Sequence, residues 1–180
     1  EILLAIKSGR AIRFNESTVR SMGRTASGVR GISMADTDEV VGMVTVEDFS
    51  KTVLVVSEKG FGKRTYLNDP ETDEPIYRVT NRGGKGVKTL NITDKTGNLI
   101  AIKDVTDDDD LMIINKSGIT IRMHVADIRS QGRATQGVKL INLKGSDQIA
   151  AVAKVERDDE EDMIEGDEPN NDSGNIIDKE

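Results

Sequence analysis

An apolar run, a turn glycine and an arginine four residues after the glycine occur together three times in the sequence. The three copies occupy residues 3–13, 54–64 and 112–122, so their starts are 51 and 58 residues apart. The glycines are Gly9, Gly60 and Gly118, and the arginines are Arg13, Arg64 and Arg122. Self-similarity at this period indicates an array of similar units, each of which buries one face against its neighbour.

A second motif, Arg-x-x-x-Arg-x-x-x-Gly-Val followed by Arg or Lys, also occurs once in each unit. Its glycine follows the turn glycine by 19 residues in the first and third units and by 26 residues in the second. The longer spacing comes from a polar insertion around residues 68–75, where two prolines predict a loop. A short apolar stretch then closes each unit, at residues 40–41, 99–100 and 149–152.

The apolar segments between these motifs are short and rich in β-branched residues, as in residues 51–56 and 137–143. Such segments predict strands, and no helical stripe of apolar residues is long enough to support a solenoid of helices. We therefore expect an all-β fold of propeller-like blades, each with about four antiparallel strands. The blades should occupy about residues 1–50, 51–108 and 109–157, and three blades are too few to close a ring.

Charge is distributed unevenly along the chain. From Arg157 to Glu180 there are 11 acidic and two basic residues, a net charge of −9, whereas the other 156 residues carry 23 basic and 21 acidic residues, a net charge of +2. Residues 158–180 contain no aromatic residue and begin with five consecutive acids, so we expect a disordered acidic tail. A basic body with an acidic tail favours nucleic acid as a partner.

Composition excludes several other classes of protein. The chain has no cysteine, which fits a reducing compartment, and no apolar run approaches the roughly 20 residues of a membrane helix. A first residue of Glu1, followed at once by an apolar run, suggests a piece of a longer protein without a signal peptide. We predict no catalytic residue and no metal site: His124 is interpreted as a surface or loop-packing residue, and residues 107–110 as a solvated acidic loop.

Basic residues of the second motif are the candidates for function. A folded repeat needs apolar residues in its core and glycine in its turns, but it does not need arginine at fixed places. Arginine presents a planar fork of donors that suits phosphate, so a repeated set could form a track of phosphate contacts; the alternative is a set of salt bridges to neighbouring blades. The candidate DNA-binding residues are Arg20, Arg24, Arg30, Arg78, Arg82, Lys85, Lys88, Arg129, Arg133 and Lys139.

A glycine-rich turn at residues 82–86 could bring backbone N–H groups close to phosphates, although an ordinary loop is the alternative. The chain has only five aromatic residues, whereas proteins that bind single strands usually stack bases on aromatic rings. No helix is expected that could enter a major groove. The pattern therefore favours duplex DNA, bound through its backbone with little sequence preference and with strong salt dependence.

Three segments, residues 16–32, 60–65 and 132–138, resemble repeat units of the A subunit of DNA gyrase. The resemblance covers about residues 1–157 and implies a β-pinwheel, a propeller-like ring of about six blades that wraps DNA, of which these would be the last three. The signature box of the family, Gln-Arg-Arg-Gly-Gly-Lys-Gly, normally lies in the first blade. Residues 80–86 match only its last five positions and lie in the middle unit, so they are interpreted as a box-like turn.

The resemblance also implies a cytoplasmic parent protein, an ATP-dependent type II topoisomerase that supercoils DNA negatively as an A2B2 assembly with the B subunit of gyrase. ATP and Mg would be bound by the partner subunit and the DNA gate, and the catalytic tyrosine would precede these blades, so this chain itself would need no cofactor. Two alternatives are the C-terminal domain of the A subunit of topoisomerase IV and a propeller-type module that binds proteins. Steep salt dependence of duplex binding would separate DNA wrapping from the protein-binding module.

Overall fold

A computed structural model describes residues 1–156, which form strands and loops with two short 3₁₀ helices, η1 (Glu16–Thr18) and η2 (Val125–Asp127). No α-helix occurs within these residues. The expected all-β fold is confirmed. The expected disorder of residues 158–180 concerns a segment outside the described residues.

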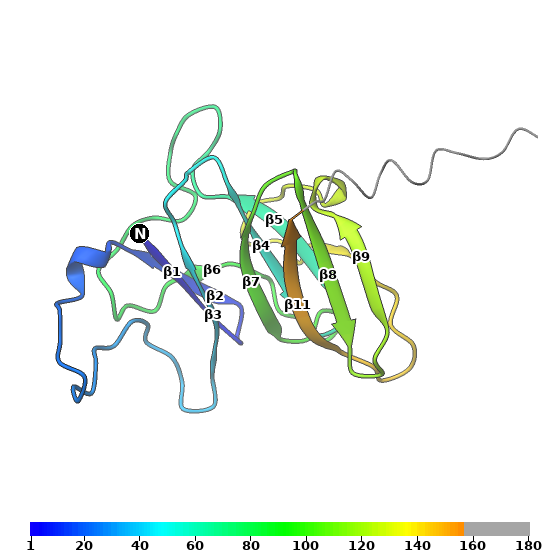
Figure 1. The fold of residues 1–180 in the computed structure, drawn as a ribbon, viewed down its shortest axis with the longest axis horizontal. Helices are drawn as coiled ribbons and strands as arrows, with labels where there is room; N and C mark the ends of the chain where they lie inside the picture. The colour runs from blue at the N-terminus through cyan, green and yellow to red at the C-terminus, as the bar shows by residue number, and fades with distance from the viewer. Residues whose placement is uncertain (157–180) are drawn as a thin grey trace, which may run out of the picture.

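Strands form three antiparallel sheets that lie side by side (Figure 1). The first sheet, of order β3-β1-β2-β6, comprises β1 (Ile2–Ile6), β2 (Arg10–Phe14), β3 (Val40–Thr45) and β6 (Val87–Lys88). The second sheet, of order β10-β5-β4-β7, comprises β4 (Thr52–Ser57), β5 (Phe61–Tyr66), β7 (Leu99–Val105) and β10 (Val138–Lys139). The third sheet, of order β11-β8-β9, comprises β8 (Asp109–Asn115), β9 (Thr120–His124) and β11 (Ile149–Glu156).

Adjacent units exchange a strand. β6 belongs to the second unit in sequence but pairs with β2 of the first, and β10 of the third unit pairs with β5 of the second. The glycine before each exchanged strand is required by this contact. A Cβ atom at Gly86 would lie 2.3 Å from the carbonyl oxygen of Ala11, and one at Gly137 would lie 2.5 Å from that of Gly62. Sheets and sequence units therefore overlap, and the division at residues 50 and 108 stays a prediction about the units.

The first motif forms a hairpin in each unit, with its glycine at the turn. Gly9 and Gly60 have φ angles of +81° and +80°, which only glycine adopts readily, and they turn the chain between β1 and β2 and between β4 and β5. The closing apolar stretch of each unit then pairs with the first strand of that hairpin. In all three sheets the register shifts at this pairing, so the β-bulge is part of the repeat.

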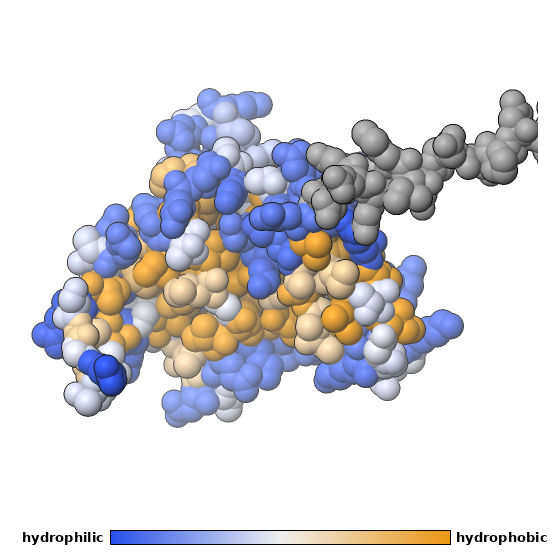
Figure 2. Space-filling model, viewed as in Figure 1, coloured by the Kyte–Doolittle hydropathy of each residue, from blue (hydrophilic) through white to orange (hydrophobic). Residues whose placement is uncertain are grey.

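The hydrophobic core lies between the sheets. β4 shows why its sequence is a continuous apolar run: Val53 and Val55 belong to a cluster shared with the first unit, whereas Leu54 and Val56 belong to a cluster shared with the third. Successive side chains of a strand point to opposite faces, so a middle blade must be apolar on both. Figure 2 shows a further apolar band over β3, β7 and β11, where Val40 and Met43 of β3 are exposed.

One expectation about acidic residues is wrong in part. Asp107 and Asp108 are exposed, but Asp109 and Asp110 begin β8 and are buried. Asp110 accepts a hydrogen bond from Nε of Arg122 and is bonded to Nδ1 of His124, both at 2.6 Å. Burial works to raise the pKa of Asp110, but these hydrogen bonds outweigh it and lower the pKa below the usual range. The buried charge is therefore balanced across the β8–β9 hairpin.

Candidate nucleic-acid interface

Two candidate residues of the second motif lie on the outer strands β6 and β10, and the other eight lie in loops. Lys88 belongs to β6 and Lys139 to β10, and each of these strands forms the edge of its sheet. Eight of the ten candidate residues are exposed, whereas Arg82 and Arg133 are partly buried. Within residues 1–156 none of the ten is paired with a carboxylate, so the salt bridges considered as an alternative are not formed there.

Arg82 fastens the second unit to the first. Its Nε donates to the carbonyl oxygen of Thr18 at 2.9 Å, and its Nη1 donates to that of Arg30 at 3.2 Å. Two backbone hydrogen bonds accompany it, from Gly83 N to Gly31 O at 2.6 Å and from Ser33 N to Gly84 O at 2.8 Å. The guanidinium of Arg82 is thus held against the backbone of Arg30, and neither arginine has a carboxylate partner within residues 1–156.

Arg133 makes the equivalent contact between the second and third units. Its Nη1 donates to the carbonyl oxygen of Lys88 at 3.2 Å, and Asn91 N donates to Thr135 O at 3.0 Å. Lys88 and Arg133 therefore form a second pair, at the same repeat positions as Arg30 and Arg82. We call these two places the first and second junctions. At each junction an arginine donates a hydrogen bond to the backbone carbonyl of the basic residue of the preceding unit.

The glycine-rich turn at residues 82–86 makes several hydrogen bonds to the first unit, and phosphate contacts by its other N–H groups stay a prediction. The N–H of Gly83 is bonded to Gly31, so it is not available to a phosphate. The carbonyl oxygens of Lys85 and Gly86 accept from the guanidinium of Arg10, at 2.9 and 2.6 Å. These bonds fix the turn against the first blade and leave the Lys85 side chain exposed.

Arginines of the first motif have a structural role that the sequence did not reveal. Arg13 is buried, and its Nη1 donates to the carbonyl oxygen of Tyr77 at 2.9 Å. The equivalent Arg64 donates from Nε to the carbonyl oxygen of Ile128 at 2.6 Å. Each accepting residue directly precedes a candidate arginine of the next unit, Arg78 or Arg129. The first-motif arginine of one unit therefore holds the backbone directly before the second-motif arginine of the next unit.

Lys63 is a further residue that the sequence did not single out. It lies on β5 and its side chain is fully buried. Its Nζ donates to the carbonyl oxygen of Gly132 at 2.6 Å and to Oγ1 of Thr135 at 3.1 Å. Burial, with a smaller contribution from the positive charge of Arg133, lowers the pKa of Lys63 to about 7. The sequence does contain a signal that this position is buried, because the other two units have isoleucine there.

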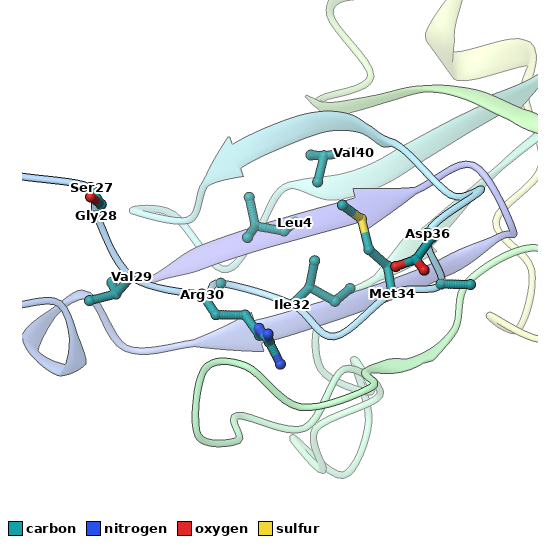
Figure 3. Close-up of a pocket in the computed structure, with 11 residues that line it drawn as sticks. Leu4, Ser27, Gly28, Val29, Arg30, Ile32, Met34, Asp36 and Val40 are labelled. Atoms are coloured by element: carbon teal, nitrogen blue, oxygen red, sulfur yellow. The ribbon is translucent and has the colours of Figure 1, made fainter.

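A surface cavity of about 680 Å³ lies beside the first blade, between Leu4 and the loop of residues 27–36. Figure 3 shows Leu4, Met34 and Val40 around it, whereas the side chain of Arg30 points away. Met34 occupies the repeat position at which other units pack a side chain on the turn glycine of the preceding unit. The cavity therefore lies on a packing face of the repeat, and Arg30 of the basic edge is among the residues that line it.

Comparison with known families fits this architecture. A family model described as DNA gyrase C-terminal domain, beta-propeller, matches residues 1–47, 51–69, 77–106 and 109–156. The chain belongs to this family. Within the middle unit the family match omits residues 70–76, which overlap the inserted loop. The resemblance noted from the sequence is thereby confirmed.

Relatives of the family include the A subunit of DNA gyrase from Staphylococcus aureus strain NCTC 8325, which is 48% identical over 166 residues, 92% of this chain. The same protein from strain MRSA252 is 48% identical over 162 residues, 89% of this chain. In both cases the aligned part is 18% of the relative, so this chain corresponds to a small part of those proteins.

Two solved structures share the fold. A DNA gyrase A C-terminal domain matches with a TM-score of 0.72 and 25% identity, over 85% of this chain and 50% of that one. The C-terminal domain of DNA topoisomerase IV matches with a TM-score of 0.77 and 23% identity, over 86% of this chain and 46% of that one.

The described residues contain neither a group of metal ligands nor a membrane-spanning helix. Within residues 1–156, no three His, Cys, Asp or Glu side chains are grouped so that they could hold a metal ion. The same residues include no helix with the length and hydropathy needed to cross a membrane.

Proposed function

We propose that this chain binds and wraps duplex DNA along its basic edge, as part of the C-terminal region of the A subunit of a DNA gyrase. The observation that carries the proposal is the repetition of the junctions. At the first junction Arg82 donates from its guanidinium to the backbone carbonyl of Arg30, and at the second Arg133 donates to that of Lys88. None of these four residues has a carboxylate partner within residues 1–156. Uncompensated basic pairs at regular places along an edge are suited to successive phosphates.

Duplex DNA fits the described surface better than a single strand does. Phe49 and Tyr66 are the only aromatic side chains among residues 1–156 that are exposed, which provides little surface for stacked bases. No α-helix of the described part is available to read a major groove. Binding through phosphates and DNA bending should therefore be tolerant of sequence.

The proposal extends to the whole protein through its relatives. A parent chain of the length of those relatives would form an A2B2 assembly with the B subunit of gyrase and would act in the cytoplasm as an ATP-dependent type II topoisomerase that introduces negative supercoils. ATP and Mg would be bound elsewhere in that assembly. Identity of 48% to the A subunit of DNA gyrase favours this function over that of topoisomerase IV.

The test is a salt series of duplex-DNA binding with two variants of equal charge. The edge variant combines Arg30→Gln, Lys88→Gln and Lys139→Gln, which keep every backbone carbonyl of the junctions. The control variant combines Lys7→Gln, Lys51→Gln and Lys116→Gln, which lie outside the second motif. We expect the edge variant to lose about 0.9 from the log–log salt slope for each phosphate contact removed, and the control to retain its slope. Equal slopes for the two variants would contradict the proposal.

A further inference from the structure

Lys63 is a buried cation at a position where the fold requires none. It stands three residues after the turn glycine of the second unit, where the first unit has Ile12 and the third has Ile121. Both isoleucines occupy the same place on their hairpins without a polar contact. An ammonium is costly to bury, and within residues 1–156 Lys63 has no carboxylate partner. A selective reason for the lysine should therefore lie in what its ammonium holds.

The group it holds is the turn that carries Arg133. Lys63 reaches the carbonyl oxygen of Gly132 on one side of Arg133 and the hydroxyl of Thr135 on the other. Its neighbour Thr65 donates from Oγ1 to the carbonyl oxygen of Gln131 at 2.9 Å. Two residues of β5 thus hold the turn by hydrogen bonds, while Arg133 donates to the carbonyl oxygen of Lys88.

The first junction explains why such a hold is needed only at the second. There the turn is tied to the preceding unit by the hydrogen bond from Gly83 N to Gly31 O. Ala134 takes the place of Gly83 in the second junction, and within residues 1–156 its N–H makes no equivalent bond. Ile12 lies under the first turn, near Gly84, where Lys63 lies under the second. The ammonium of Lys63 therefore replaces a missing backbone bond.

We propose that Lys63 is a positioning residue for DNA binding, which holds the turn at residues 132–135 so that Arg133 is fixed for a phosphate contact. The inference rests on the proposed function. Ordering the turn before DNA arrives reduces the conformational entropy lost on binding, so the effect should appear in DNA affinity more than in stability. Burial lowers the pKa of Lys63 to about 7, and both the ammonium and the neutral amine carry N–H groups that can donate to Gly132 and Thr135.

The test is a double-mutant cycle in duplex-DNA affinity with Lys63→Met, Arg133→Ala and the double variant. We expect Lys63→Met to weaken binding about three- to tenfold, as the loss of one or two hydrogen bonds would. The double variant should bind no more weakly than Arg133→Ala alone, because both changes remove the same contact. Lys63→Met combined with Arg82→Ala, at the other junction, should instead be additive. Ile12→Met is the matched control and should leave affinity unchanged.

A readout that does not involve DNA accompanies the cycle. Amide hydrogen exchange at Thr135 and Asn91, whose N–H groups are hydrogen-bonded in this turn, should be faster in Lys63→Met, while exchange in β4 and β8 is unchanged. If Lys63→Met fails to fold, Lys63→Ile replaces it, because two units already carry isoleucine there.

Two results have distinct meanings. If Lys63→Met binds as the wild type does while Arg133→Ala binds more weakly, or if Lys63→Met is additive with Arg133→Ala, the positioning role is overturned and DNA binding stands. If Arg133→Ala and the edge variant both leave affinity unchanged, the proposed function itself fails.

Discussion

At the scale of single residues, the first-motif arginines of the first two units differ in their surroundings from the second-motif arginines. Arg13 and Arg64 are buried and bonded to backbone carbonyls of the next unit, so their charge is used within the fold. Arg82 and Arg133 are partly buried, because the guanidinium of each donates a hydrogen bond to a backbone carbonyl of the preceding unit. Arg24, at the same repeat position, is exposed and makes no hydrogen bond within residues 1–156.

These surroundings predict different effects of truncation. Arg82→Ala removes two hydrogen bonds to carbonyl oxygens and should lower the free energy of unfolding by about 1–3 kcal/mol. Arg24→Ala should change it by less than about 0.5 kcal/mol, because it loses no bond within the described residues. Chemical denaturation measures both. Equal losses of stability would show that the contacts of Arg82 contribute nothing to folding.

Lys63 predicts a pH dependence of stability. Its pKa falls to about 7 in the folded protein, below the unperturbed lysine value of about 10.4. Between these values the unfolded chain binds more protons, so the free energy of unfolding should rise as the pH increases from 7 to about 10. Tyr77, whose pKa is raised by burial, stays neutral over this range.

Denaturation at pH 7 and pH 9 checks this dependence against Lys63→Met. The stability of the variant should rise less between the two pH values than that of the wild type, because methionine has no titrating group. Parallel changes in the two proteins would indicate that the Lys63 ammonium is not destabilised by the fold.

At the scale of elements, the strand exchange decides how blades are joined. β6 and β10 have only two residues each, but the glycine before each strand lies against the backbone of the preceding unit. Gly28 occupies the same position in the first unit and has the same left-handed φ of +80° as Gly137, but has no atom within 4 Å of an added Cβ. All three glycines therefore have a left-handed backbone, but only Gly86 and Gly137 are also closely packed, so the two effects can be measured separately.

Alanine substitutions use this difference. Gly28→Ala should cost about 1–2 kcal/mol, from the left-handed conformation alone. Gly137→Ala has the same φ and adds a clash with the carbonyl of Gly62, so it should cost about 1–3 kcal/mol more. Unfolding free energies give the comparison, and faster amide exchange at Val138 would show release of β10. Similar costs at the two sites would argue against tight packing of the exchanged strand.

Local patterns in the sequence account for the blades but not for their joining. The run at residues 53–56 and the turn at Gly60 predict a buried hairpin, and the structure has one. The pairing of Val87 with Ala11 could not be predicted, because a two-residue strand has no periodicity and its partner is far away in sequence. Lys63 and Asp110 are charged, which suggests a surface position, yet both are buried with polar partners that only the tertiary fold supplies.

At the scale of the whole molecule, strand exchange repeats one geometry along the chain. Every blade boundary in residues 1–156 places a pair of basic residues beside the exchanged strand. A duplex that contacts successive pairs must follow the arrangement of the blades, so binding should be coupled to DNA bending. The small net charge of residues 1–156 makes the position of these side chains more important than overall attraction.

The most direct test of the central claim is the linking number of a relaxed, closed plasmid that is bound by the chain and then treated with a nicking-closing enzyme. Wrapping predicts a shift of one sign that grows with the amount of bound protein, is lost in the edge variant (Arg30→Gln, Lys88→Gln and Lys139→Gln) and persists in the control variant (Lys7→Gln, Lys51→Gln and Lys116→Gln). Tight binding of the wild-type chain without any change in linking number would contradict the claim that its basic edge wraps DNA.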